Sequence, residues 1–261
     1  EADHLDVLKA AQIVHDERIG QPILLGDRET ILELKEEIGF DADVPIIDPK
    51  SSDTKAARYR YAEAYWQKNQ RKGITLLEAR KWMRERNYYA AMMVNENEAD
   101  CMVTGYSRNY ATVVKPIIDL IGTAKGVSRV AAANLMMTKR GPMFLADTTI
   151  NINPTVEDLA KISRLTAGLV KKFGMNPVMA MLSFANFGVS KSDSARKSKE
   201  AVDYIHKNYP NVVIDGEVQA DFALNPELLE KEFPFSKLNG KKVNTLIFPN
   251  LESANITYKI M

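Results

Sequence analysis

The chain has 261 residues, of which 45% are hydrophobic and 26% charged, which is typical of a soluble globular protein with one large domain or two smaller ones. Lys and Arg number 35 against 34 Asp and Glu, and the net charge of +1 argues against nucleic acid or an anionic membrane as a partner. No apolar run could span a bilayer, the start lacks the core of a signal peptide, and the single cysteine, Cys101, suits a reducing compartment. We therefore expect a cytoplasmic protein.

Helices and short apolar strands alternate along the first half of the sequence. The spacing predicts helices over 4–20 and 28–39, each closed by glycine, and strands over 21–27 and 44–49. Two long helical segments follow, the second starting at Thr75 with Glu78 three residues later, the pattern of a capping box. Residues 100–105 ("DCMVTG") predict another short strand, and residues 109–122 another helix.

The second half begins with a predicted antiparallel hairpin over 129–147, whose turn is "TKRGP". Thr155 with Asp158 then predicts the start of a helix that Gly174 ends. Further strands are predicted over 177–184, 212–219 and 243–248, separated by helices over 194–208 and 225–233, with a last turn at 248–250 leading into a closing helix. Such alternation predicts two α/β/α lobes, residues 1–126 and 127–261, with mostly parallel sheets and a ligand cleft between them.

Local signatures of common chemistries are missing. The sequence has no glycine-rich dinucleotide or phosphate loop, no nucleophile elbow and no zinc-type spacing. We interpret His4, His15 and His206 as exposed helix residues, and Cys101 as an inert thiol in a buried strand.

Polar residues follow the predicted strands in the stretches "VTGYSRNY", "LADTTININP", "MLSFANFG", "IDGEVQAD" and "IFPNLESAN". Residues just beyond the carboxyl ends of parallel strands face the ligand crevice, so these stretches predict a binding site. In "DGEVQAD" the polar residues recur with a period of two and would share one face of an extended segment. Two alternatives stay open for that stretch: a solvent-facing edge strand, and acidic side chains (Asp215, Glu217 and Asp221) that only cap turns or bind water.

Together these stretches resemble the phosphate acetyltransferase (phosphotransacetylase) family over essentially the whole chain. "DGEVQAD" resembles the family's Asp-Gly-Glu-Leu-Gln-x-Asp, "FPNLESANITYK" its Phe-Pro-Asp-Leu-x-Ser-Gly-Asn-Ile-x-Tyr-Lys, and "ADTTININP" its Ala-Asp-Cys-Ala-Val-Asn-Pro-Asn-Pro. The resemblance implies a metal-free transfer of acetyl between coenzyme A and phosphate, which needs cations for phosphate and donors for the oxyanion.

The chain departs from the transferase pattern where those donors belong. The family's His-Ser-Thr-Ala-Asp-Thr-x-Arg-Pro corresponds here to "RNYATVVKP", so Arg108, Asn109, Tyr110 and Lys115 replace histidine, serine, threonine and arginine. Its Ser-Thr-Lys-Gly is here Ala-Asn-Phe-Gly (185–188). Positive charge is kept, but hydroxyl donors and a bidentate guanidinium are lost. The family's catalytic Ser-Arg-Gly segment, which also returns to the first lobe, would follow Met261.

These departures resemble the C-terminal phosphotransacetylase-like domain of large bacterial NADP-dependent malic enzymes. The resemblance implies a regulatory and assembly module that senses acetyl-CoA and transfers no acetyl group. It implies no cofactor in this segment, with NADP and a divalent metal in a malic-enzyme domain of the same polypeptide. It also implies a homo-oligomer, at least a dimer through the second lobe.

Two alternatives stay open: an active phosphate acetyltransferase, and a purely structural dimerisation domain without a ligand. We assign no catalytic or metal-binding residue. The residues expected to bind acetyl-CoA or phosphate are Thr104, Arg108, Asn109, Lys115, Asp147, Thr148, Asn151, Ser183, Asn186, Gln219, Ser253 and Asn255.

Overall fold

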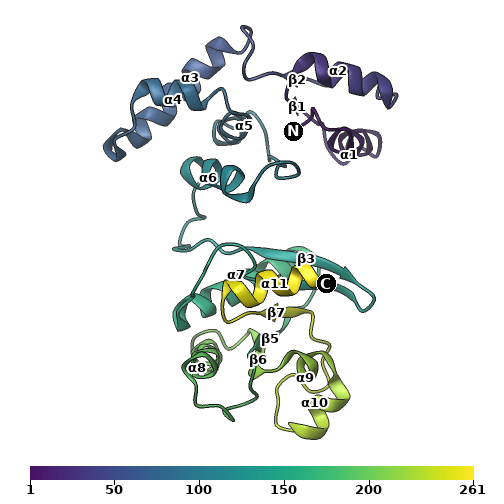
Figure 1. The fold of residues 1–261 in the computed structure, drawn as a ribbon, viewed down its shortest axis with the longest axis vertical. Coiled ribbons are helices and arrows are strands. Elements are labelled where there is room, and N and C mark those ends of the chain that lie inside the picture. Colours follow the sequence, from purple (N-terminus) through teal and green to yellow (C-terminus); the bar gives the residue numbers. More distant parts are fainter. The chain divides into compact units, whose positions relative to one another are not determined.

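The computed structural model describes residues 1–261, which form two compact units, Glu1–Ala124 and Lys125–Met261 (Figure 1). Both units combine helices with sheets whose strands are mostly parallel, as the alternation of elements predicts. None of the helices has the length and apolar character needed to cross a membrane.

The first unit contains one small parallel sheet and six helices. Strands β1 and β2 pair in parallel with Leu24 opposite Ile46. The elements are α1 (Leu5–Asp16), β1 (Leu24–Leu25), α2 (Arg28–Glu37), β2 (Ile46–Ile47), α3 (Lys55–Asn69), a 3-10 turn (Gln70–Lys72), α4 (Leu76–Trp82), α5 (Arg86–Asn95) and α6 (Tyr110–Leu120).

Two apolar clusters hold this unit together. One joins α1, α2 and the sheet through Leu8, Leu24 and Ile31, all at most 3% exposed. The other joins α3, α4 and α5 through an aromatic group in which Tyr61 meets Tyr89 edge to face, with ring centroids 5.1 Å apart. Large rings in such contacts contribute more than their buried area alone, so this aromatic cluster helps to hold the three helices together.

Helix starts follow the sequence signals closely. Asp27 caps α2 by accepting a hydrogen bond from the Thr30 N–H at 2.9 Å, and Thr75 and Glu78 form the predicted capping box at the start of α4. The long helix predicted from Thr75 is instead two helices, because α4 ends at Trp82 and α5 begins at Arg86.

The strand predicted over 100–105 is wrong. These residues form no strand, Val103 is 95% exposed, and Cys101 is an exposed thiol rather than a buried one. An apolar run becomes a strand only where a neighbouring strand can accept its backbone hydrogen bonds, and the small sheet contains only β1 and β2. The apolar sequence of residues 100–105 does not show whether a neighbouring strand is present to pair with them.

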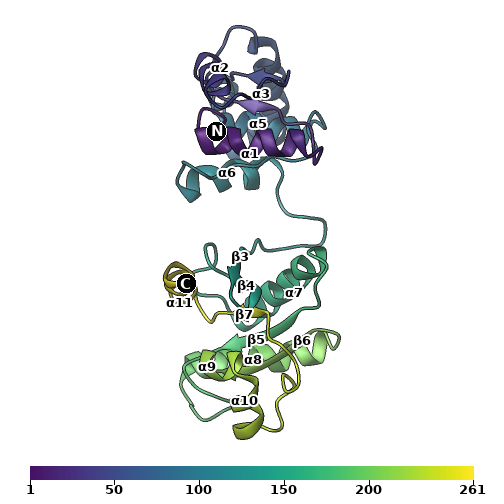
Figure 2. The same ribbon diagram turned by 90° about the vertical axis from the view of Figure 1, so that its right-hand side faces the viewer.

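The second unit is built on a five-stranded sheet in the order β3-β4-β7-β5-β6, which the strand labels follow in Figure 2. The hairpin of β3 and β4 is antiparallel, as predicted, and the other pairings are parallel. The elements are β3 (Ala133–Thr138), β4 (Gly141–Ala146), α7 (Val156–Lys172), β5 (Val178–Leu182), α8 (Asp193–Asn208), β6 (Val213–Val218), α9 (Ala220–Leu224), α10 (Pro226–Glu232), β7 (Thr245–Ile247) and α11 (Leu251–Ile260).

Helices cover both faces of this sheet. On one face, α7 and α8 bury residues such as Leu159 and Val202 against Met179 and Met181 of β5. On the other, residues from α9 to α11, including Ala254, pack on β4, β5 and β7. The sheet is therefore buried on both sides, which explains why its parallel strands read as continuous apolar runs.

Candidate functional site

The carboxyl ends of β4, β7, β5 and β6 lie along one edge of the second unit's sheet, because these strands are parallel neighbours. The loops that follow them carry the residues predicted from the strand-end rule. Asp147 to Asn151 follow β4, Ser183 to Gly188 follow β5, Gln219 follows β6, and Asn250 follows β7. The structure thus brings the predicted second-lobe residues to one edge.

Asp147 is 3% exposed, and backbone donors surround its carboxylate. Oδ1 accepts hydrogen bonds from the N–H groups of Thr149 at 3.0 Å and Ile150 at 3.1 Å, and Oδ2 accepts one from the N–H of Asn151 at 3.0 Å. The Asn151 amide also donates to Oδ2. A carboxylate held by so many donors fixes the loop, so Asp147 shapes this edge rather than presenting a free acid.

Neighbouring polar groups lock the same loop to other elements. The Thr148 hydroxyl donates to Asn134 Oδ1 at 2.5 Å, and the Thr148 carbonyl accepts from Asn255 Nδ2 at 3.2 Å, which ties α11 to the loop. Asn151 Oδ1 accepts from Arg129 at 2.7 Å. Arg129 also pairs with Asp158 of α7 at 2.8 Å.

The predicted residues after β5 and β6 bond to one another. Asn186 Nδ2 donates to Gln219 Oε1 at 2.6 Å, while Asn186 Oδ1 accepts from the Gln219 N–H at 2.7 Å. Gln219 Nε2 donates to the Phe184 carbonyl at 2.8 Å. The Ser183 hydroxyl only accepts a long bond, 3.4 Å, from the Ala185 N–H. These amides therefore hold the two loops together.

The turn after β7 forms as predicted. Asn250 is the N-cap of α11 and accepts a hydrogen bond from the Ser253 N–H at 2.9 Å, and the Ser253 hydroxyl donates back to the Asn250 carbonyl at 3.0 Å. The cap thus satisfies one of the helix's first free donors.

The acidic stretch after residue 214 lies on β6, which is an edge strand as the alternative supposed, but its acids are buried, so the solvent-facing part of that alternative is wrong. Asp215 is 8% exposed and accepts from the Ser236 hydroxyl at 2.9 Å and the Lys237 N–H at 2.7 Å, a turn-capping role. Glu217 is fully buried, and its Oε1 accepts from the Gly188 N–H at 2.6 Å while Oε2 has no partner. Asp221 does not share their face, because the strand ends at Val218 and α9 starts at Ala220.

The predicted first-lobe residues surround the start of α6. The Thr104 hydroxyl donates to Asn87 Oδ1 at 2.9 Å. Asn109 is the N-cap of α6, and its Oδ1 accepts from both the N–H and the hydroxyl of Thr112, at 3.0 and 2.7 Å. Lys115 Nζ lies 6.0 Å from the centroid of the Trp82 ring. Asn109 and Thr104 therefore have structural bonds of their own.

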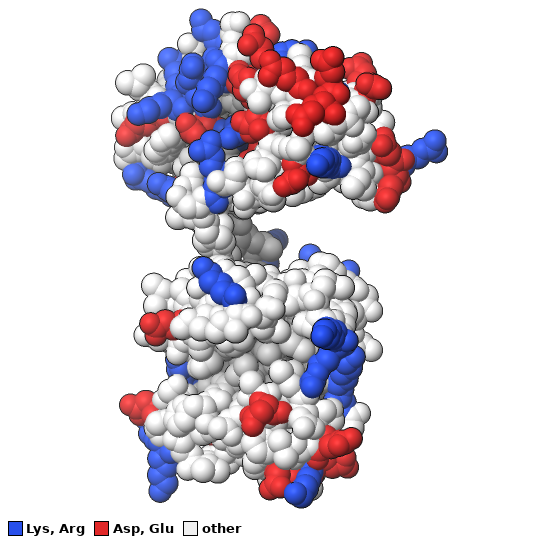
Figure 3. All heavy atoms as spheres, turned by 45° about the vertical axis from the view of Figure 1, so that its right-hand side comes forward, with Lys and Arg blue, Asp and Glu red and all other residues white.

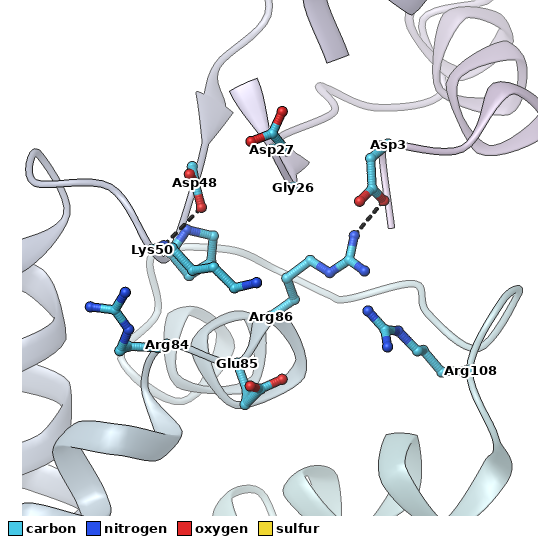
Figure 4. A pocket seen from close by; sticks show the side chains of 10 residues that line it. Asp3, Gly26, Asp27, Asp48, Lys50, Arg84, Glu85, Arg86 and Arg108 are labelled. Carbon is cyan, nitrogen blue, oxygen red and sulfur yellow. Dashed lines mark hydrogen bonds and ion pairs between the residues drawn. The ribbon is translucent and has the colours of Figure 1, made fainter. Parts of the chain in front are cut away.

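Arg108 lines a basic cleft within the first unit, shown in Figure 4, with a volume of about 140 Å³. Segments that follow β1 and β2 and precede α5 and α6 meet around it. The lining residues of this basic cleft are Asp3, Gly26, Asp27, Asp48, Pro49, Lys50, Arg84, Glu85, Arg86 and Arg108.

Four acids and four cations line the basic cleft, which is named for its cations; three of the acids have hydrogen-bond or ion-pair partners, whereas three of the cations form no ion pair. Asp3 forms an ion pair with Arg86, which reaches toward it in Figure 4. Hydrogen bonds from the backbone and hydroxyl of Thr30 hold the pKa of the Asp27 carboxyl below its ordinary value, and Asp48 accepts from the Lys50 N–H at 2.8 Å.

No ion pair involves the side chains of Lys50, Arg84 or Arg108 in this cleft. Guanidinium and ammonium groups without counter-ions are the usual protein ligands for phosphate. Lys50, Arg84 and Arg108 are thus the groups of this cleft suited to contact an anion, while its four acids and four cations leave it without net charge.

Of the cations that line the basic cleft, Arg108 is among the residues predicted from the sequence, whereas Lys50, Arg84 and Arg86 are not. Lys50 directly follows the second predicted strand in "VPIIDPK", so the strand-end rule could have identified it. Arg84 and Arg86 precede α5 or stand at its start, where no strand ends, and nothing in the local pattern distinguishes them from solvated arginines.

The whole chain, residues 1–261, matches the family model for phosphate acetyl/butaryl transferase. It is 33% identical over 269 residues to the NADP-dependent malic enzyme of Haemophilus influenzae, covering 100% of this chain and 35% of that protein. It is 34% identical over 273 residues to the phosphate acetyltransferase of Treponema pallidum, covering 100% of this chain and 80% of that protein.

A phosphotransacetylase structure from Streptococcus pyogenes matches with a TM-score of 0.85 at 34% identity, over 100% of this chain and 78% of that one. The chain thus spans about a third of the length of this malic enzyme, and about four fifths of the Treponema pallidum enzyme and of the Streptococcus pyogenes structure. The resemblance carried by its strand-end motifs is confirmed, and the chain belongs to the phosphate acetyl/butaryl transferase family.

Proposed function

We propose that this chain is the phosphotransacetylase-like domain of an NADP-dependent malic enzyme, and that it binds acetyl-CoA as an effector without transferring the acetyl group. The malic-enzyme relative supports the context. On this proposal the chain needs no cofactor of its own, and NADP and a divalent metal serve a malic-enzyme domain in the same polypeptide.

The observation that carries this proposal is that cations without ion pairs line a cleft of the first unit, whereas the residue at the position of the transferases' serine serves as a helix cap. Lys50, Arg84 and Arg108 line the basic cleft and form no ion pair, although the charge of Lys50 helps to lower the pKa of Asp27 in the same cleft. Asn109, which stands where the transferases have a serine, caps α6 by accepting two hydrogen bonds on Oδ1 from Thr112, so its side chain is oriented toward the helix start and carries no hydroxyl donor. Phosphate groups of acetyl-CoA can bind to the cations, but acetyl transfer also needs free donors aimed at the developing oxyanion.

Titration calorimetry of the chain with acetyl-CoA, coenzyme A and S-acetylpantetheine tests the binding. We expect the first two to bind and S-acetylpantetheine, which has no phosphate attached, to fail, because the basic cleft recognises phosphate. Arg108→Gln should weaken acetyl-CoA binding about tenfold, since a charged hydrogen bond is worth about 1.5–3 kcal/mol and the exposed site lies at the low end of that range.

Arg71→Gln is the matched control, because Arg71 is an exposed arginine of the same unit that does not line the basic cleft. It removes the same charge and should change the affinity less than about twofold, in line with a distant exposed charge. An equal loss of acetyl-CoA affinity in Arg108→Gln and Arg71→Gln would contradict phosphate recognition at this cleft. Tight binding of S-acetylpantetheine would contradict it as well.

The second unit is the proposed place of self-association. On the face seen in Figure 3, this unit (lower in the picture) carries fewer charged side chains than the first. Its edge strand β3 pairs only with β4, and it exposes Leu135 at 38% and Met137 at 78%. Leu135 lies opposite Phe144, whose ring contacts the half-exposed Phe173. An apolar edge strand of this kind commonly pairs with a second copy.

Light scattering after size exclusion tests this association. The chain should form at least a dimer, and Met137→Asp should shift it toward the monomer by placing a charge on the edge. Val189→Asp is the control, because Val189 is 80% exposed in the same unit but lies outside the strands. A dimer that tolerates Met137→Asp would move the interface elsewhere.

An active phosphate acetyltransferase is the alternative function. The coverage of acetyltransferase relatives, 80% of the protein from Treponema pallidum, favours it. Release of coenzyme A from acetyl-CoA plus phosphate separates the two proposals. Turnover at rates of about 1 per second or more, ordinary for enzymes, would establish the transferase, whereas binding without turnover supports the effector role.

A further inference from the structure

A second hollow lies at the amino ends of β4 and β7, at the opposite edge of the sheet from the strand-end loops. Its volume is about 580 Å³, within the range of about 300–1,000 Å³ that small-molecule sites occupy. We call it the amino-edge hollow. Its lining residues are Arg140, Gly141, Pro142, Met143, Met175, Ala223, Leu224, Pro226, Gly240, Lys241, Lys242, Val243 and Asn244.

The floor of the amino-edge hollow is the hydrophobic core itself. Met143, Ala223 and Val243 are at most 7% exposed and belong to the cluster beneath α9, α10 and α11. Met175 and Leu224 form part of its wall. Methionine side chains adapt to the shape of an apolar guest, so this hollow suits a flexible hydrocarbon chain.

The rim of the amino-edge hollow is basic and contains no acid. Arg140, Lys241 and Lys242 line it, and no Asp or Glu does. Arg140 donates to the Leu224 carbonyl, Lys242 Nζ to the Arg140 carbonyl at 2.5 Å, and Lys241 Nζ to the Lys237 carbonyl at 2.5 Å. None of the three forms an ion pair. Their charges are therefore uncompensated, and each keeps donors to spare.

We propose that the amino-edge hollow binds an aliphatic chain that carries one anionic head group. The aliphatic chain of the ligand lies on Met143, Met175, Ala223 and Val243. Its head group, a carboxylate or a phosphate, binds to the side chains of Arg140, Lys241 and Lys242. This site is separate from the basic cleft of the first unit and does not depend on the function proposed above. An apolar floor with a one-sided basic rim is complementary to such an amphipathic anion in both shape and charge.

Calorimetric titrations of the full chain with octanoate, octyl phosphate and octanol test the site. Both anions should bind, and the stronger of the two identifies the head group; octanol should bind at least tenfold more weakly. Shortening the carboxylate from octanoate to hexanoate should weaken binding about fourfold per methylene, the equivalent of about 0.8 kcal/mol for each buried CH₂.

Arg140→Gln should weaken octanoate binding about tenfold. The matched control is Lys139→Gln, in the same hairpin turn, because Lys139 is exposed and does not line the hollow. Met175→Glu supplies a second test that leaves the turn intact, since it places a carboxylate in the wall and should abolish binding of both anions. Octanol binding as tight as octanoate, affinity independent of chain length, or equal losses in the Arg140 and Lys139 variants would overturn the proposal.

Discussion

Gly216 in β6 occupies a backbone position that no other residue fits. Its φ is +136°, and a Cβ built there would lie 2.5 Å from the Met181 carbonyl oxygen and 3.1 Å from the Val218 nitrogen. Both neighbours are backbone atoms of paired strands, so neither can move without disturbing the sheet. Gly216→Ala should therefore destabilise the second unit.

The expected cost has two parts. A non-glycine residue in this conformation costs about 1–3 kcal/mol, and the overlap with backbone adds about 1–3 kcal/mol. A loss of about 4 kcal/mol is a large share of the roughly 5–15 kcal/mol that keeps a domain folded. Gly168→Ala in α7 is the matched control, because Gly168 is exposed and a methyl group added there would meet no atom within 4 Å; it should gain about 0.5–1 kcal/mol.

Urea unfolding can resolve the two units. Both tryptophans, Trp66 and Trp82, lie in the first unit, so their fluorescence follows that unit alone, whereas far-ultraviolet circular dichroism follows both. In Gly216→Ala we expect the dichroism transition to move to lower urea while the fluorescence midpoint holds. An unchanged dichroism transition, or equal loss from Gly168→Ala, would refute the steric argument.

Three further results are expected. Burial opposes ionisation of Asp158, but hydrogen bonds from Thr155 and the charge of Arg129 hold its pKa below the ordinary value of 3.8. The ionised carboxylate therefore stabilises the folded state above pH 3.8, and this stabilisation is lost as the pH falls through the lowered pKa. Asp158→Asn should thus cost about 1–2 kcal/mol in urea unfolding at pH 7, and this cost should shrink as the pH falls below 3.8; a pH-independent difference would contradict this sign. Cys101 should react with a thiol reagent in the folded chain as fast as a small exposed thiol does, because it lies on the surface; protection until unfolding would contradict that placement. Asp3→Asn should strengthen acetyl-CoA binding about threefold by releasing Arg86, as calorimetry would measure, and weaker binding would show that the ion pair orders the basic cleft instead.

Periodicity and caps predicted most of the fold because they are local. Thr75, Thr155 and Asn250 start helices where their side chains satisfy the first backbone donors, and the turn at Arg140 reverses the chain into an antiparallel hairpin. The strand expected over 100–105 failed because pairing depends on distant segments, which no local pattern encodes.

The candidate site was partly predictable for a related reason. The strand-end rule places Asp147, Asn186 and Gln219 at one edge of the sheet, and the structure agrees. The rule could not predict the hydrogen bonds between Asn186 and Gln219, because these depend on the distance between the two loops and on the side-chain rotamers. It also could not find Arg84 or Arg86, which reach the basic cleft from the segment before and at the start of α5.

The shortest strand of the large sheet has an unexpected implication. β7 comprises Thr245–Ile247, about 10 Å of extended chain, and is at most 2% exposed throughout. Val243 and Asn244 of the amino-edge hollow precede it, and the turn that caps α11 follows it. We expect a ligand in the amino-edge hollow that displaces the amino end of this short, buried strand to displace its carboxyl end as well. If an alkyl anion changes the affinity of the protein for a ligand at the carboxyl edge of the sheet, that ligand must change the affinity for the alkyl anion by the same factor.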